Sequence, residues 1–287
     1  MQIVSDRGMD ASTTQLEGLD VHLAPLTFTL DGKSYRSGVD ISSEDFYTLL
    51  DESKSYPITS QPSPGDFADI YRGVAAVDPE ILSIHISSGL SGTINAARMG
   101  AAMVPEANVT FYDTKTLSGA EGWHVEAAAK AAKAGWAKDA ILRMLEQVTS
   151  LTETLYTIAT LKYLIHGGRI SHLKGLLASV LNVKPIIGVE KARGTYVNVG
   201  QARTLDRAIS MLADMVAQRL PAGSGIRVQV MHGNNLSGAE NLCARLQSMF
   251  SCTWLPTMSI APVLGAHTGS GLVGVVFAPD AAFPQIP

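Results

Sequence analysis

Three short segments rich in serine, threonine and glycine are the parts of this chain best suited to bind a ligand. The first, Ser87–Thr93, reads Ser-Ser-Gly-Leu-Ser-Gly-Thr and stands between a strand-like run and a helix-like run. Glycine lets the backbone approach a ligand closely, and the free amides at a helix start attract anions. The segment predicts a carboxylate or phosphate site around Ser91 and Gly92. A helix-capping turn explains the same residues equally well.

The second segment runs from Thr59 to Pro64 and places hydroxyl groups before another expected helix. Ser63 suits the N-cap and Pro64 suits the first helical position, so capping accounts for both. Thr59, Ser60 and Gln61 are not needed for capping, so capping leaves their presence unexplained. Taken alone, however, this segment is typical of a structural turn.

The third segment, Gly265–Gly271, is expected to be a small-residue loop that contains His267 and Thr268. A neutral imidazole can donate a hydrogen bond to a carboxylate, and an imidazolium donates a stronger one. An exposed loop histidine is the simpler interpretation of this segment by itself. The segment becomes a candidate for ligand binding only when it is considered together with the other two segments.

Familiar catalytic and metal-binding patterns are absent from the sequence. Ser91 is not in a G-x-S-x-G nucleophile elbow, because Gly92 follows it directly. The seven histidines include no H-E-x-x-H spacing, and the two cysteines, Cys243 and Cys252, form no metal pattern. We therefore expect neither a catalytic metal nor a cofactor.

Composition narrows the class of protein. The 287 residues are 46% hydrophobic and 17% charged, which excludes a disordered chain. The net charge is −4 and there is no basic stripe, so a nucleic-acid-binding module is not expected. No apolar run reaches the roughly 18 residues of a membrane span, and the first residues do not resemble a signal peptide. These features predict a cytoplasmic protein without a transmembrane segment.

The order of expected elements predicts how the three segments are positioned. In the first half, strand-like and helix-like runs alternate, which favours a parallel sheet covered on both faces. The loops at 6–8, 87–93 and 114–119 would follow strands of that sheet, where α/β proteins bind ligands. The pattern changes near residue 155. We expect an α/β domain over 1–155 and a smaller α/β domain over 156–287, with the ligand between them.

Periodicity and turn residues give the individual elements. A hairpin turn is expected at 31–32, and capping boxes at 42–45 and 237–240. Strands are expected over 81–86, 109–112, 155–160, 186–190, 195–199, 226–231 and 273–277. Helices are expected over 94–104, 161–169, 173–181 and 205–216, with further helices ending near 135 and covering 141–148.

Taken together and in order, the motifs resemble those of the DegV family. The resemblance is carried by Thr59–Pro64, Ile86–Thr93, Leu161–Leu164, Gly167–Ile170 and Gly265–Gly269, and it covers nearly the whole chain. Each motif is weak alone, but the ordered set is specific. It implies two α/β domains with a long-chain fatty acid bound between them. In some members of the family, the acyl carboxylate is presented to a separate ATP-dependent kinase, which makes acyl-phosphate for phospholipid synthesis.

The resemblance also implies roles for particular residues. Thr59 matches a threonine that binds the carboxylate, Ser91 and the Gly92 amide match a second anchor, and His267 matches a histidine of the same network. The full set of expected ligand-binding residues is Thr59, Ser60, Ser91, Gly92, His267 and Thr268. The expected partner-binding residues are Arg169, in the Gly-Gly-Arg-Ile motif, and Arg203.

Two residues depart from the family pattern. Arg7 follows Asp6 where the family usually has a small hydroxyl residue. Thr27 stands where some members carry a basic residue. Both departures bear on how the head group is bound.

Three functional hypotheses follow. The first is a fatty-acid carrier without chemistry of its own, in which a tail of about fifteen methylenes contributes roughly 12 kcal/mol on burial. That gain offsets an association cost on the order of 4–15 kcal/mol. The second is a hydrolase or phosphotransferase that acts on a small anionic substrate, with Ser91 as nucleophile and His267 as base. The third is a protein-interaction module in which the serine- and glycine-rich loops are only turns.

Overall fold

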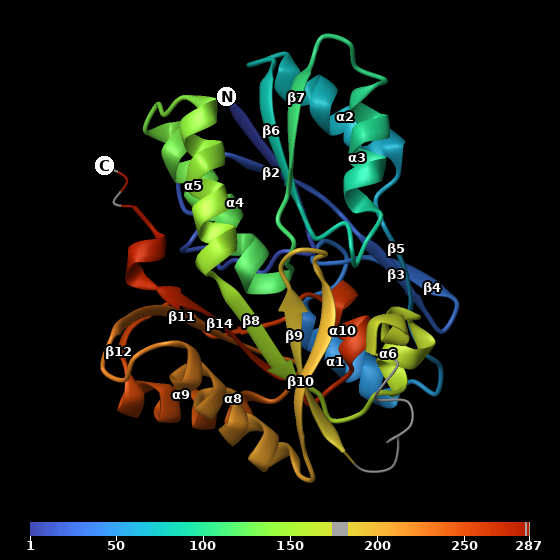
Figure 1. Cartoon of the computed structure of the whole chain (residues 1–287). Helices are drawn as coiled ribbons and strands as arrows, with labels where there is room; N and C mark the ends of the chain where they lie inside the picture. The colour runs from blue at the N-terminus through green and yellow to red at the C-terminus, as the bar shows by residue number, and fades with distance from the viewer. Residues whose placement is uncertain (174–182, 285, 287) are drawn as a thin grey trace.

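The computed structural model describes residues 1–173, 183–284 and 286, and contains three β-sheets (Figure 1). The first sheet is parallel, in the order β2-β1-β6-β7. Its strands are β1 (Gln2–Asp6), β2 (Val21–Ala24), β6 (Glu80–His85) and β7 (Asn108–Asp113). Its helices are α2 (Pro64–Ala75), α3 (Thr93–Ala101), α4 (Ser118–Lys133) and α5 (Lys138–Leu151). The parallel sheet expected from the alternating pattern is confirmed.

Alternation along β1 explains why both faces of this sheet are covered. Ile3 packs with residues of α4 and α5, whereas Val4, the next residue, packs with residues of α2 and α3. Successive side chains of a strand point to opposite faces, so a strand buried on both sides reads as a continuous apolar run. The loops after β1, β6 and β7 therefore emerge together at one edge of the sheet.

The second sheet is mixed, in the order β10-β9-β8-β14-β11-β12, and β13 also pairs with β11. Its strands are β8 (Glu153–Thr157), β9 (Lys184–Glu190), β10 (Thr195–Ala202), β11 (Gly225–His232), β12 (Ser251–Trp254), β13 (Met258–Ser259) and β14 (Val273–Pro279). Helices α8 (Leu205–Arg219) and α9 (Leu236–Met249) cover one face, packing with residues such as Leu155 and Val275. The opposite face, which carries Tyr156 and Val276, is directed toward the first half of the chain.

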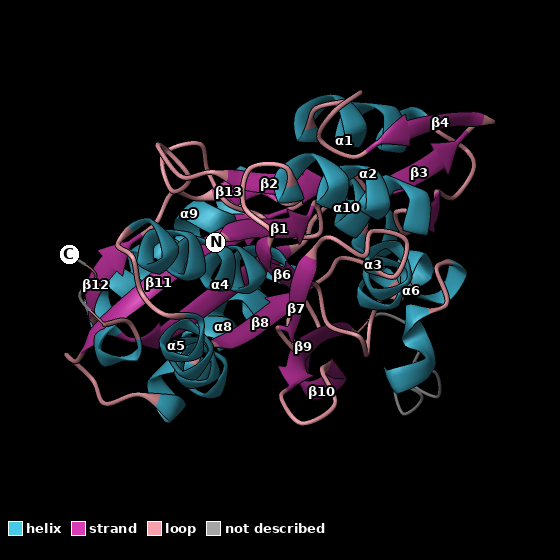
Figure 2. Ribbon diagram, turned by 90° about the horizontal axis from the view of Figure 1, so that it is seen from above, coloured by secondary structure: helices cyan, strands magenta, loops and turns pink. Residues whose placement is uncertain are grey.

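A small third sheet interlocks the two halves. It joins β4 (Lys33–Arg36), β3 (Thr27–Leu30) and β5 (Ile58–Ser60), and lies with α1 (Ser43–Glu52) to one side of the molecule (Figure 2). Helix α10 (Pro262–Thr268), from the C-terminal half, packs against α1, β3 and β5. The chain passes from the first main sheet to the second between α5 and β8, close to residue 155. The division into domains 1–155 and 156–287 stays a prediction, because α10 and the small sheet pack across it.

Most local signals are confirmed. The turn of the β3–β4 hairpin has Asp31 and Gly32 at φ 50° and 78°. The hydroxyl of Ser42 accepts the Asp45 amide at 3.0 Å, and Ser63 caps α2 through a complete capping box with Asp66. Helix α6 (Lys162–His166) ends, as expected, at a glycine pair and is followed by a 3₁₀ turn over Arg169–Leu173.

Three local predictions need comment. The capping box at 237–240 is wrong, because α9 begins at Leu236 and its cap is Asn235, whose side chain accepts the Gly238 amide at 3.0 Å. The loop expected over Gly265–Gly271 is wrong over its first part, which forms the end of α10. The helix expected over 173–181 lies, apart from its first residue, outside the described residues.

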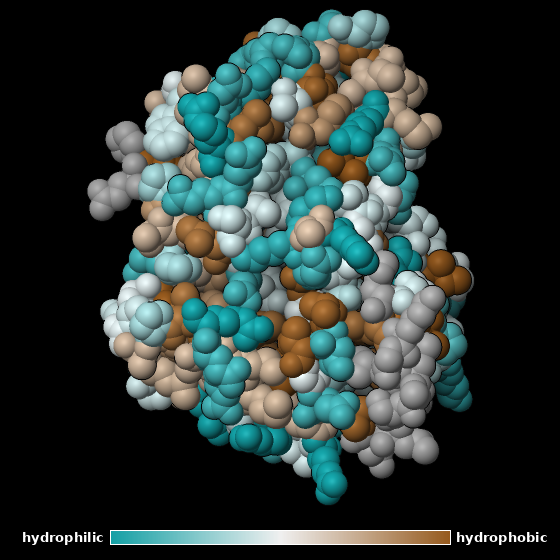
Figure 3. Space-filling model, viewed as in Figure 1, coloured by the Kyte–Doolittle hydropathy of each residue, from teal (hydrophilic) through white to brown (hydrophobic). Residues whose placement is uncertain are grey.

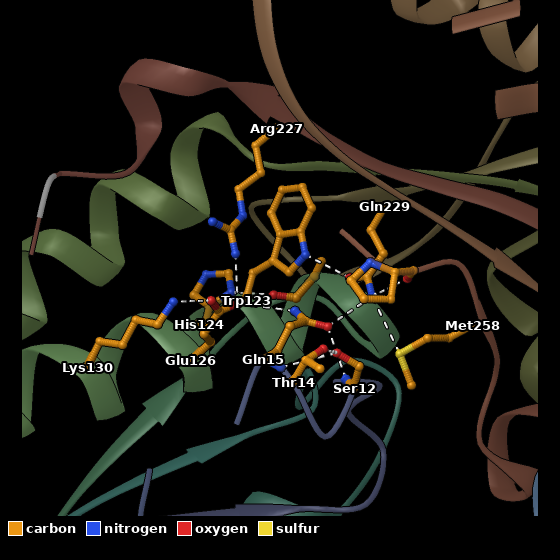
Figure 4. A network of polar contacts seen from close by, with 12 residues as sticks. Ser12, Thr14, Gln15, Trp123, His124, Glu126, Lys130, Arg227, Gln229 and Met258 are labelled. Carbon is orange, nitrogen blue, oxygen red and sulfur yellow. Dashed lines mark hydrogen bonds and ion pairs between the residues drawn. The ribbon is translucent and has the colours of Figure 1, made fainter. Parts of the chain in front are cut away.

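A buried polar network fastens the first sheet's helices to the second sheet (Figure 4). Arg227 on β11 donates to Glu126 on α4 at 2.7 Å, and its guanidinium lies 5.1 Å from the ring centre of Trp123. Trp123 in turn donates to Gln229 at 2.8 Å, and Gln229 donates to Gln15 at 3.2 Å. Most of these groups have protein partners, although Arg227 Nε has none among the described residues. Their contacts hold α4 on β11.

On the face of the molecule shown in Figure 3, hydrophobic side chains form small patches that are separated by hydrophilic residues. Within the described residues, none of the helices has the length and apolar character needed to cross a bilayer.

Candidate ligand-binding site

A hydrogen bond between Thr59 and His267 forms the centre of the candidate site. Thr59 lies on β5 opposite Phe28 of β3, and His267 lies in the last turn of α10, which packs on both strands. Thr59 Oγ1 and His267 Nε2 are 2.8 Å apart. Two of the three segments singled out in the sequence therefore meet directly.

The imidazole of His267 is held in its neutral form. Burial lowers the pKa of His267 to about 4, and the positive charge of Arg169 contributes in the same direction. His267 Nδ1 is buried and has no hydrogen-bond partner among the described residues. The absence of a side chain at Gly167 makes room for this nitrogen, because a Cβ there would collide with it.

The remaining segment, Ser87–Thr93, lies between β6 of the first sheet and the start of α3. The loop after β6 ends at Gly92, the N-cap of α3, which has no side-chain cap. Ser91 Oγ lies 2.8 Å from Thr93 Oγ1 and accepts the Thr93 amide at 3.3 Å. A Cβ at Gly92 would collide with the side chain of Gln61, so glycine lets the two segments approach closely. Backbone amides at a helix start beside a hydroxyl are suited to an anion.

The β9–β10 hairpin holds this loop in place. Ser87 Oγ donates to the Gly194 carbonyl at 2.8 Å. A side chain at Gly89 would collide with the carbonyls of Arg193 and Gly194, so the hairpin tip sits directly on the loop. The second half of the chain therefore contributes to the position of Ser91.

A cavity of about 780 Å³ unites these groups, and we call it the head cavity. Four of the six expected ligand-binding residues line it, namely Thr59, Ser60, Ser91 and His267. Ser60 and Gln61 are exposed, which places the polar groups at the open end. Gly92 adjoins Ser91. Thr268 is not in this wall: it is buried, donates its hydroxyl to the Leu264 carbonyl at 3.2 Å, and lines a neighbouring apolar cavity.

A second cavity, which we call the tail cavity, adjoins the first. The two share four wall residues, which are Leu117, Tyr196, Leu264 and His267. The tail cavity extends along the inner face of the second sheet and is almost entirely apolar. Residues found only in its wall include Tyr156, Met231, Ile260, Leu272, Val275 and Val276. A partly polar cavity and an almost entirely apolar one thus lie side by side and share part of their walls.

The two arginines expected to bind a partner lie in different places. Arg169 lines the head cavity and donates to the Gly167 carbonyl at 2.7 Å. It is the one permanently charged side chain in the described wall of that cavity. Arg203 is exposed and follows directly after β10. It comes seven residues after Tyr196 of the head-cavity wall, which is roughly 23 Å along an extended strand.

Comparison with known proteins agrees with this architecture. The model of the family described as "Uncharacterised protein, DegV family" matches residues 1–280. The chain belongs to the DegV family. A DegV domain-containing protein of Deinococcus radiodurans is 35% identical over 279 residues, which are 97% of this chain and 96% of the relative.

Two solved DegV structures share the fold over nearly their full length. A DegV family protein from Thermus thermophilus, described by its fatty acid binding, has a TM-score of 0.89 and 28% identity, covering 97% of this chain and 99% of its own. DegV from Bacillus subtilis, described as a fatty acid binding protein, has a TM-score of 0.87 and 26% identity with the same coverage. The family and the α/β fold class expected from the sequence are confirmed.

Sequence reasoning missed part of the cavity wall of this DegV protein. Gln61 was recognisable only as a polar residue that helix capping does not need. Residues of the tail cavity such as Tyr156 and Leu272 carried no signal, because the wall of an apolar cavity and an ordinary core use the same side chains. Only the arrangement of the second sheet opposite the first shows which of them face a cavity.

The catalytic alternative is not favoured by this geometry in the DegV chain. A serine nucleophile needs a base within hydrogen-bond reach. In the described structure Ser91 bonds to Thr93, whereas His267 bonds to Thr59. The two candidates therefore share a cavity wall without forming a nucleophile–base pair.

Proposed function

We propose that this DegV protein binds a long-chain fatty acid, with the carboxylate in the head cavity and the acyl chain in the tail cavity. The observation that supports this most is that a partly polar cavity and an apolar one are neighbours with a common wall, made of Leu117, Tyr196, Leu264 and His267. An amphipathic ligand with one polar end matches a site that is polar at its mouth and apolar inside. The related Thermus and Bacillus proteins are described as fatty-acid binders, which agrees with this assignment.

Neutral donors and one cation account for the head-group chemistry. With His267 neutral, its Nε2–H can donate to Thr59 Oγ1, which frees the threonine proton for the ligand carboxylate. Ser91 and the Gly92 amide supply donors from the other side. Arg169, in the same wall, contributes positive charge without a carboxylate partner among the described residues. These groups satisfy a carboxylate that would be costly to bury alone.

The tail supplies most of the affinity. Each buried methylene contributes about 0.8 kcal/mol, so a chain of about fifteen gains roughly 12 kcal/mol before the cost of association is subtracted. Polar contacts at the head then fix orientation. We expect affinity to rise with chain length until the tail cavity is filled.

The first test is the identity of the bound molecule. Denaturing extraction of the purified protein followed by mass spectrometry is expected to release about one fatty acid per chain. After delipidation, oleate and palmitate are expected to raise the melting temperature. The absence of lipid, together with no change in melting temperature, would contradict the proposal.

A variant at the junction of the two cavities tests where the tail goes. Leu117→Trp places a large side chain between them. We expect the gain in affinity with each added methylene to disappear, whereas butyrate, which is short enough to stay in the head cavity, binds as before. An unchanged chain-length dependence in a folded variant would show that the acyl chain lies elsewhere.

We further propose that the protein does no chemistry itself and presents the carboxylate to a separate ATP-dependent kinase. The head cavity opens at Ser60 and Gln61, so the carboxylate end faces solvent. Arg203 is exposed and lies outside both cavities. With a fatty-acid kinase added, Arg203→Glu is expected to lower acyl-phosphate formation without changing oleate affinity, whereas Arg169→Gln should lower both.

The absence of intrinsic activity is tested with Ser91→Ala. Wild type and variant are expected to show equal background rates on ester and phosphate substrates. A rate that is lost in the variant would favour the hydrolase or phosphotransferase instead.

A further inference from the structure

A third cavity, with an empty volume of about 1000 Å³, lies beyond the carboxyl ends of β1 and β2. It shares no wall residue with the head or tail cavity. Three distant segments form it: the loop after β1 with Arg7 and Asp10, the β4–α1 loop with Ser37 and Gly38, and the chain before α10 with Met258. Ligands of α/β sheets bind beyond the carboxyl ends of the strands, so this is a second position of that kind on the same sheet edge.

The guanidinium of Arg7 has no partner in this cavity. Its side chain makes no hydrogen bond or ion pair within the described part of the chain, and its Nε is buried without an acceptor. Gly38 lets it lie close to the backbone, because Arg7 Nη1 is only 3.2 Å from where a Cβ would stand. Burial lowers the pKa of Arg7, and no neighbouring carboxylate counteracts this effect. A half-buried guanidinium with unused donors is an unfavourable state that an anion would relieve.

The nearest acidic residues in sequence are already engaged. Asp6 accepts two backbone amides and the Nδ1 of His85, at 2.8–3.2 Å. Asp10 accepts the Ser118 hydroxyl at 2.6 Å and the Ala261 amide at 2.8 Å. Neither carboxylate forms an ion pair with Arg7, so the charge of Arg7 is not neutralised from within.

Hydroxyl groups line the same cavity as the Arg7 guanidinium. Ser37 is fully buried and accepts the Val263 amide at 3.2 Å, which leaves its proton available to donate. The other hydroxyl residues in the wall are Ser12, Thr13, Ser43 and Ser259. The wall also holds the carboxyl group of Asp10, whose oxygens accept from Ser118 and Ala261 and whose pKa burial raises to about 7. The cation of Arg7 and the hydroxyl donors are then the groups suited to the oxygens of an anion.

We propose that this cavity binds a small dissolved oxyanion of the phosphate or carboxylate type, with Arg7 as its cationic ligand. The guanidinium presents paired N–H groups that match two oxygens of such an anion. The site is independent of the fatty-acid proposal, because it uses other residues. Since its wall includes Ala261 and Pro262, at the start of the helix that carries His267, an occupied site would also brace α10.

The test follows arginine side-chain signals by ¹⁵N–¹H NMR during titration with inorganic phosphate and, separately, with acetate, at constant ionic strength. We expect a saturable shift of the Arg7 Nε–H signal, assigned by its loss in Arg7→Gln. The backbone amide of Gly38, which lies beside Arg7 in the same wall, reports affinity in every variant. The affinity of Arg7→Gln should fall about tenfold or more, and that of Arg7→Lys, which keeps the charge but loses the paired N–H groups, should lie in between. Arg72→Gln, at an exposed arginine paired with Asp69, is the matched control and should leave the titration unchanged.

Several outcomes would overturn the proposal. They are the lack of a saturable shift with either anion, equal affinity in wild type and Arg7→Gln, or Arg7-dependent sedimentation with phosphatidic-acid vesicles but no response to free anions. Oleate binding is measured on the same variants. Arg7→Gln should leave it intact, so failure of the anion site can be told apart from failure of the fatty-acid site.

Discussion

Thr59 Oγ1 lies 2.8 Å from Nε2 of His267, although 208 positions separate the two residues in the chain. The contact joins the small third sheet to α10 and sits in the wall of the head cavity. It turns an isolated hydroxyl and an isolated imidazole into one polar unit.

Replacement of Thr59 by valine should weaken fatty-acid binding about tenfold or more. The variant keeps the shape of the side chain but removes a donor to the carboxylate, and a hydrogen bond to a charged group contributes about 1.5–3 kcal/mol. Titration calorimetry with oleate measures the effect. Thr48→Val makes the same chemical change at an exposed position of α1 and should bind as wild type does. Equal affinities for all three proteins would remove Thr59 from the site.

Alanine at Gly167 should disturb ligand binding, whereas alanine at Gly168 should not. A Cβ at Gly167 collides with His267 Nδ1, so the imidazole must move away from Thr59. Gly168 has φ 74° and open space around it, so alanine there costs about 1–2 kcal/mol in backbone strain and leaves the imidazole alone. Oleate affinity and denaturant unfolding of both variants separate the two effects. A normal affinity in Gly167→Ala would show that the position of His267 is not critical.

Asp10 should make the protein less stable as the pH rises. Burial is the main cause that raises the pKa of Asp10 from 3.8 to about 7. Between those values the folded state holds a proton that the unfolded state releases, so its contribution is fully present below about pH 4 and is lost as the pH rises through about 7. Relative to Asp10→Asn, wild-type unfolding free energy should therefore fall across this window. Asp139→Asn, at an exposed site, should run parallel to wild type. A flat difference between wild type and Asp10→Asn would refute the prediction.

The start of α9 offers a matched pair of capping variants. Asn235 caps the helix through the Gly238 amide, whereas Ser237 lies inside it. Asn235→Ala should cost about 1 kcal/mol of unfolding free energy, and Ser237→Ala should cost close to nothing or stabilise slightly. Urea unfolding of both proteins measures the difference. The reverse order would mean that α9 begins later than the structure shows.

Most of the elements and the family could be predicted from local patterns in the sequence. Alternating strand and helix patterns, the caps at Ser42 and Ser63 and the turn at Asp31-Gly32 depend on neighbouring residues only, so they are legible along the chain. The α9 cap was misplaced because Asn235 and Ser237 are both good capping residues, and the choice depends on how the chain leaves β11. Glycine and alanine show little hydrophobic periodicity, so the sequence predicts a loop over residues 265–268. In the structure these residues are helical and belong to α10, which packs on α1 and β3.

The cavities between these elements depend on tertiary packing and could not be predicted from the sequence. Thr59, Ser91 and His267 face one cavity because β5, the loop after β6 and α10 are packed together, which no local pattern records. The tail cavity exists because the inner face of the second sheet lies opposite Leu117, and no local pattern in the sequence records that arrangement. Arg7 reads in the sequence as a charged residue after a strand, and its unpartnered state is a property of the three segments around it. Local sequence sets backbone preference, whereas cavities and unpaired charges arise from contacts between segments distant in the chain.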